Sequence, residues 1–153
     1  MAIIRPTTLT LIATVLSTEM NGLSNGSTSN VGPTIDLTST NRYAKYLLEW
    51  DNSNTFSGSP SLGGAITVYR VLALDGTNFS LASSSILSSD NNRIATLLLA
   101  TVTNAGQKVS SPGIDGTIMV PALCRFGIRN LSGQPLPGTD NVLRLYGYNI
   151  ESV

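Results

Sequence analysis

Ala65-Ile-Thr-Val-Tyr-Arg-Val-Leu-Ala-Leu74 is the most strand-like stretch of this 153-residue chain, because β-branched and aromatic side chains fill it without a glycine or proline. It ends at Asp75-Gly76, a dipeptide typical of hairpin turns. We therefore predict a hairpin over residues 65–87, with Phe79–Leu87 as the returning strand. Alternation along this strand places Ile66, Val68, Arg70 and Leu72 on one face. Tyr69 and Val71 lie on the opposite face.

Other short runs rich in β-branched residues precede and follow this stretch, and clusters of Gly, Asn, Ser and Pro separate them. The further predicted strands are Thr8–Ser17, Thr34–Thr38, Arg42–Asp51, Arg93–Thr103, Gly116–Val120, Leu123–Asn130 and Val142–Ile150. This count favours an all-β fold, a jelly-roll-like β-sandwich of about eight strands in two antiparallel sheets. We expect a single domain over residues 8–153, preceded by an N-terminal arm of residues 1–7.

Two of these runs have a second interpretation. The segment Ile94–Ala100 also fits a helix, although the flanking Thr and Val residues favour a strand. The segment Thr8–Ser17, after Arg5, has some features of a signal peptide, but its interspersed threonines and the lack of an Ala-x-Ala site favour a first strand.

Alternation also predicts which side chains face the core. In the segment around the single tryptophan, the residues expected to face inward are Ala44, Tyr46, Leu48 and Trp50. In the later run Leu123–Asn130, apolar and polar or glycine residues alternate, with Cys124, Phe126 and Ile128 on one face and Arg125, Gly127 and Arg129 on the other.

Charge is sparse and balanced. Nine basic and nine acidic residues cancel and make up only 12% of the chain, about half the usual share. Generic nucleic-acid binding needs a dense basic patch, which this sequence lacks, so we expect no nucleic-acid partner. No apolar run approaches the roughly 20 residues of a membrane span, so we expect no membrane partner. Near-zero net charge gives little protection against association and suits a protein that works in an assembly.

The residues that usually carry catalysis are missing or isolated. The chain has no histidine, the commonest general base and metal ligand. Gly22-Leu-Ser-Asn-Gly26 matches the Gly-x-Ser-x-Gly elbow of hydrolases, but that elbow needs a histidine and a following helix. Glu49 and Asp51 share one face of a strand, as glycosidase carboxylates can, but they lie at a strand end beside a polar loop, and we interpret them as a solvated edge. Cys124 is the single cysteine, which excludes an intrachain disulfide and gives no zinc site. We predict a protein that is not an enzyme and has no cofactor or metal.

Arginine and tyrosine residues in the later strands, together with the N-terminal arm, are candidates for a surface that binds partners. Arg125, Arg129 and Arg144 form a small basic stripe if their strands pair, and otherwise a solvated sheet face. Tyr146 and Tyr148 share the parity of Arg144 and suit a protein partner or a sugar. The arm Met1–Pro6 could add to a neighbour's sheet. The candidate interface residues are Ile3, Ile4, Arg5, Arg125, Arg129, Arg144, Tyr146 and Tyr148.

The order of these parts resembles the jelly-roll decoration, or cement, proteins of tailed-phage capsids. The resemblance covers roughly residues 30–150, through these segments: Thr38-Ser-Thr-Asn-Arg-Tyr-Ala-Lys-Tyr-Leu-Leu-Glu-Trp50, residues 65–79, Val120-Pro-Ala-Leu-Cys-Arg-Phe-Gly-Ile-Arg-Asn130 and Asn141-Val-Leu-Arg-Leu-Tyr-Gly-Tyr-Asn149. It implies a virion protein, assembled in the host cytoplasm. The implied form is a homotrimer on the outer capsid surface that clamps subunits of the major capsid protein.

The alternative is a carbohydrate-binding or fibre- or tail-tip jelly-roll module, in which Trp50 and several tyrosines stack on sugars. Alternation instead places Trp50 in the core, and that placement is the simpler interpretation.

Overall fold

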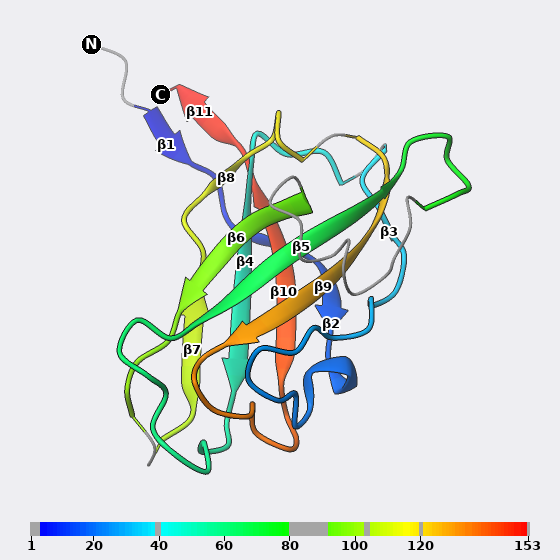
Figure 1. Ribbon diagram of the computed structural model, residues 1–153. Coiled ribbons are helices and arrows are strands. Elements are labelled where there is room, and N and C mark those ends of the chain that lie inside the picture. The colour runs from blue at the N-terminus through cyan, green and yellow to red at the C-terminus, as the bar shows by residue number, and fades with distance from the viewer. Residues whose placement is uncertain (1–3, 39–40, 80–91, 103–104, 120, 153) are drawn as a thin grey trace.

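The computed structural model describes residues 4–38, 41–79, 92–102, 105–119 and 121–152, and is shown in Figure 1. Its elements in chain order are β1 (Ile4–Pro6), β2 (Thr10–Leu16), the 3-10 helix η1 (Thr18–Met20), β3 (Ile35–Asp36), β4 (Lys45–Asn52), β5 (Ala65–Ala73), β6 (Arg93–Leu98), β7 (Gln107–Ser110), β8 (Ile114–Asp115), β9 (Leu123–Leu131), β10 (Val142–Tyr148) and β11 (Ile150–Ser152). Among these residues no helix is long and apolar enough to cross a membrane.

Two antiparallel sheets pack face to face (Figure 1). One has the order β2-β10-β4-β7, with β8 also paired to β4, and the other has the order β3-β9-β5-β6. In chain order, the first of the eight strands in these two sheets pairs with the last, the second with the second to last, and so on inward. The pairs are β2 with β10, β3 with β9, β4 with β7 and β5 with β6. A long antiparallel hairpin rolled into two sheets produces this pairing, so the fold is the predicted jelly-roll-like β-sandwich.

The core lies between the sheets. Alternation in β4 buries Tyr46, Leu48 and Trp50 on the inner face, as the sequence predicts, and Trp50 is fully buried. Opposite them, β9 contributes Cys124, Phe126 and Ile128. Burying one such side chain stabilises the fold by roughly 1.5–3 kcal/mol. Ala44 is the exception to the prediction, since it is exposed just before β4 begins.

Strand β5 is buried on both faces. Ile66 and Val68 enter the main core, while Tyr69 and Val71 form a second cluster on the outer face. Val31 packs over this second cluster because its segment lies along β9, where the Ser29 and Gly32 amides donate to the carbonyls of Ile128 and Phe126. Phe79 packs against the same cluster. Alternation alone therefore does not separate inside from outside in this strand.

Two predicted strands differ from the structure. Strand β5 pairs with β6 from Ala65↔Leu98 to Tyr69↔Arg93. The strand that follows β5 in the described chain and pairs with it is therefore Arg93–Leu98. The predicted return Phe79–Leu87 lies outside the described residues except for Phe79, which is not in a strand. The predicted strand Gly116–Val120 is wrong over residues 116–119, which form a turn after β8, and Val120 lies outside the described residues. In this turn the amides of Ile118 and Met119 donate to the carbonyl of Asp115. The segment 93–98 is a strand, which settles the ambiguity in favour of the β interpretation.

The two ends of the chain form a separate ribbon. Strands β1 and β11 pair antiparallel and join neither main sheet. Figure 1 shows this ribbon at one end of the sandwich.

Candidate functional site

The outer face of the β2-β10-β4-β7 sheet carries a row of apolar and aromatic side chains. Tyr146 on β10 lies directly opposite Leu47 on β4 and Leu11 on β2. Leu9 and Leu11 are 49% and 52% exposed, so both add apolar surface to this face. Leu9, Leu47 and Tyr148 also line one hollow with Pro6 and Thr7. We call Leu9, Leu11, Leu47, Tyr146 and Tyr148 the leucine–tyrosine stripe.

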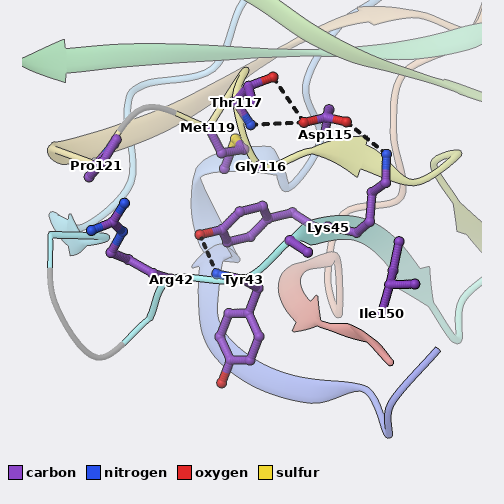
Figure 2. A pocket seen from close by; sticks show the side chains of 11 residues that line it. Arg42, Tyr43, Lys45, Asp115, Gly116, Thr117, Met119, Pro121 and Ile150 are labelled. Carbon is purple, nitrogen blue, oxygen red and sulfur yellow. Dashed lines mark hydrogen bonds and ion pairs between the residues drawn. The ribbon is translucent and has the colours of Figure 1, made fainter. Parts of the chain in front are cut away.

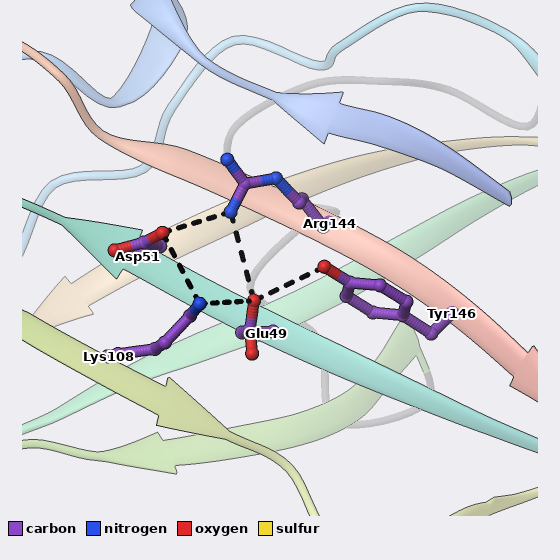
Figure 3. A network of polar contacts seen from close by, with 5 residues as sticks. All are labelled: Glu49, Asp51, Lys108, Arg144 and Tyr146. Atoms are coloured by element: carbon purple, nitrogen blue, oxygen red, sulfur yellow. Dashed lines mark hydrogen bonds and ion pairs between the residues drawn. The ribbon is translucent and has the colours of Figure 1, made fainter. Parts of the chain in front are cut away.

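A cluster of four charges borders the stripe on one side (Figure 3). The guanidinium Nη1 of Arg144 lies 3.0 Å from Oδ2 of Asp51 and 3.8 Å from Oε1 of Glu49. The Nζ of Lys108 lies 3.5 Å from Glu49 and 3.7 Å from Asp51. Cross-strand register explains the cluster, because Arg144 lies opposite Glu49 and Lys108 lies opposite Asp51.

The cluster neutralises itself. Its two cations balance its two carboxylates, and the hydrogen bond to Asp51 raises the pKa of Arg144. Tyr146 donates to Oε1 of Glu49 at 3.3 Å and so links the cluster to the stripe. The result is an apolar centre beside a polar rim without net charge, an arrangement typical of protein–protein interfaces.

A second ion pair lies near the other end of the stripe, around an open hollow of about 690 Å³ (Figure 2). Lys45 Nζ lies 2.8 Å from Oδ2 of Asp115, and Asp115 also accepts bonds from the amide and hydroxyl of Thr117. These contacts, led by the bond from Lys45, hold the pKa of Asp115 well below its usual range. Asp115 is therefore engaged as a carboxylate, and the hollow offers no free acid from this residue.

The structure divides the predicted arginine stripe between two sheets. Arg144 lies with Tyr146 and Tyr148 on β10, as their shared parity predicts, whereas Arg125 and Arg129 lie on β9. Because β9 and β10 belong to different sheets, the three arginines do not form one stripe. Arg125 lies over the ring of Phe79 at 4.2 Å and donates to Thr34, and Arg129 donates to the carbonyl of Gly26.

The predicted arm lies partly in the terminal ribbon. Ile3 lies outside the described residues, while Ile4 and Arg5 belong to β1 and pair with Ser152 and Glu151. Arg5 is exposed. The arm is therefore paired with the chain's own C-terminal strand from Ile4 to Pro6.

None of the catalytic candidates has a catalytic setting. Ser24 is an exposed loop residue, and no helix follows it before β3. Glu49 and Asp51 lie near the end of β4, as predicted, but β4 pairs with β10 on one side and β7 on the other, so the interpretation as a solvated edge is wrong. Both carboxylates are bound in the charged cluster. Burial raises the pKa of the Cys124 thiol to about 12. Among the described residues no three His, Cys, Asp or Glu side chains gather as a metal site would require.

Sequence reasoning missed Leu9, Leu11, Leu47 and Lys108 as surface residues that belong together. Leu47 alternates with the inward-facing Tyr46 and Leu48, but its neighbours on the outer face come from β2 and β10, near the two ends of the chain. No protein-family model and no curated protein matches this chain.

Proposed function

We propose that this chain is a capsid decoration, or cement, protein of a tailed phage. It binds the outer surface of the shell of major capsid protein as a homotrimer, stabilises that shell and catalyses no reaction. It is then a virion component that joins the capsid during assembly in the host cytoplasm.

The leucine–tyrosine stripe with its self-neutralised rim is the observation that carries this proposal. The exposed leucines of the stripe lie beside its tyrosines as one apolar patch, and burial of this patch gains about 25 cal/mol per Å² of apolar area. The neighbouring ion pairs are satisfied within the chain, so they need no complementary charges on the partner. Such a face binds by shape and burial, which is the contact that a cement protein needs.

The sandwich also suits a protein that must withstand mechanical stress. Its core is continuous between two sheets whose strands pair mostly with strands far away in sequence. A shell displays many copies of one subunit, and a multivalent trimer converts weak single contacts into firm attachment. Stabilisation follows because the protein binds the assembled shell and not the separated subunits.

The test uses shells assembled from the major capsid protein of the phage that encodes this chain, prepared without this chain. Purified protein is titrated onto the shells, and the shells are sedimented. We expect saturable co-pelleting at a fixed ratio to the major capsid protein and a higher temperature of shell disruption. Protein that stays in the supernatant at all concentrations would overturn the proposal.

The sugar-binding alternative loses its main sequence argument, because Trp50 is fully buried and cannot stack on a ligand. Tyr146 and Tyr148 remain half-buried on the outer face. On a glycan array we expect no binding; specific retention of one glycan class would favour the alternative.

A further inference from the structure

We propose that the terminal ribbon of β1 and β11 joins copies of this chain, with the open edge of β1 of one copy pairing with the open edge of β11 of the next. This inference deepens the proposed function by assigning the contact within the trimer, and it rests on that proposal for the assembly of three copies. Its partner is a second copy of the same chain.

The ribbon is incomplete as an isolated structure. It contains three residue pairs, from Ile4↔Ser152 to Pro6↔Ile150, and pairs with no other strand among the described residues. A two-stranded ribbon of this size is marginal in water, and each outer edge carries backbone groups without a strand partner. A further strand on either edge would therefore stabilise it.

The base of the ribbon is nevertheless held firmly. Asn149 accepts the amide of Thr7 at 2.8 Å on its carbonyl, and its own amide donates to Oγ1 of Thr7 at 2.8 Å. The side-chain oxygen of Asn149 also accepts the amide of Ala44 at 3.0 Å, just before β4. The ribbon thus leaves the sandwich in a fixed direction, which lowers the entropy cost of pairing with a neighbour.

Charge complementarity selects a second copy as the occupant. Arg5 and Glu151 lie opposite each other in the ribbon, are exposed, and form no ion pair within the described part of the chain. An identical ribbon supplies the opposite charge to each. Ile150, which is 45% exposed beside the hollow of Figure 2, would be covered in the same contact.

The same charges favour a head-to-tail contact. Two β11 strands paired about Glu151 would place like charges opposite each other, which is destabilising. Pairing β1 with β11 of the next copy repeats the Arg5–Glu151 opposition between chains. Successive amides point to opposite edges of a strand, and the bond from the Thr7 amide to the carbonyl of Asn149 places the Arg5 amide on the β11 side. Pro6 has no N–H to donate, so the open edge of β1 offers the amide of Ile4 and the carbonyls of Ile4 and Pro6. Head-to-tail contacts close into rings, and a trimer is one such ring.

The test measures the mass of the purified chain by size-exclusion chromatography with light scattering, without shells. We expect three times the 16.1 kDa chain mass for the wild type. Arg5→Glu and Glu151→Arg should each shift the protein towards the monomer, and the double variant should restore the trimer. Arg129→Glu, which changes an arginine on the other sheet, is the matched control and should leave the mass unchanged.

A mixing experiment distinguishes contacts between chains from contacts within one. Chains carrying Arg5→Cys are mixed with chains carrying Glu151→Cys, and a disulfide between the two chains should form faster than one between Arg5→Cys and Leu62→Cys chains. A wild type that is monomeric at all concentrations, or an oligomer that ignores both charge reversals, would overturn the inference. A monomer that still binds shells contradicts the ribbon contact alone, whereas a ribbon-linked trimer that ignores shells contradicts the proposed function alone.

Discussion

The hydroxyl of Tyr146 donates to Oε1 of Glu49 across the β10–β4 pair at 3.3 Å. This bond ties the aromatic part of the leucine–tyrosine stripe to the charged cluster, in which Glu49 is only 16% exposed at its side chain. The apolar surface and its polar border are therefore one connected structure. Changes to the cluster should alter stability, whereas changes to the exposed leucines should alter binding.

Replacing Arg144 should destabilise the outer sheet face. Arg144→Met removes the cation at 3.0 Å from Asp51 and leaves the two carboxylates with Lys108 alone. We expect a loss of about 1 kcal/mol in the free energy of unfolding, as for a partly buried ion pair. Lys108→Met is the matched control, because Lys108 is 58% exposed and its pairs are longer. Urea denaturation measures both, and a larger loss for Lys108→Met would contradict the assigned geometry.

Stability should fall in acid partly through Asp115. The folded state depresses the pKa of Asp115 below its ordinary value of 3.8, so its contribution to stability is present above about pH 4 and is lost as the pH falls through the depressed value. In Asp115→Asn, the drop in the urea midpoint between pH 7 and pH 3 should be smaller. Lys45→Met removes the main partner and should reduce the drop as well. An unchanged pH profile in both variants would show that the ion pair does not form in solution.

The thiol of Cys124 should be unreactive in the folded protein. It is fully buried, and burial raises its pKa to about 12. Labelling with a thiol reagent at pH 8 should therefore be very slow in buffer and complete after unfolding in guanidinium. Rapid labelling of the native protein would mean that β9 does not place Cys124 in the core.

Variants of Arg70 test the packing between β5 and the turn that follows β8. Its guanidinium is buried and donates to the carbonyl of Ile118 at 2.7 Å and to the sulfur of Met119 at 3.4 Å. Burial lowers the pKa of Arg70. Arg70→Met keeps the volume without a buried charge and should change the free energy of unfolding by less than about 1.5 kcal/mol. Arg70→Ala opens a cavity and should cost about 2–4 kcal/mol. Equal losses in the two variants would assign the stability to the hydrogen bonds and not to packing.

Local periodicity explains which parts of the fold could be predicted. Alternation in β4, β9 and β10 placed Trp50, Phe126 and Tyr146 on the correct faces, because side-chain direction depends only on strand geometry. Strand β7 was missed, because Gln107–Ser110 is short and mostly polar. Strand pairing depends on contacts far apart in sequence, so the separation of Arg125 from Arg144 could not be predicted from their spacing.

The leucine–tyrosine stripe and the charged cluster could be predicted only in part, because they too depend on long-range strand pairing. Tyr146 and Tyr148 share one strand and could be grouped from their parity. Leu11 joins them only because β2 pairs with β10 across most of the chain length. Lys108 meets Glu49 and Asp51 only because β7 pairs with β4. Each of these contacts depends on pairing between strands that lie far apart in sequence, and no short sequence motif indicates that pairing.

Binding of leucine variants to the shells tests the central claim most directly. Leu11→Glu places a charge in the centre of the stripe, opposite Tyr146, and Leu62→Glu makes the same change at a 96% exposed loop residue before β5. Loss of one buried leucine is worth about 1.5–3 kcal/mol, and about 1.4 kcal/mol corresponds to a tenfold change in affinity. We predict that Leu11→Glu binds shells at least about tenfold more weakly than the wild type, with unchanged thermal stability, and that Leu62→Glu binds normally. Wild-type affinity in Leu11→Glu would contradict the assignment of the leucine–tyrosine stripe as the capsid-binding surface.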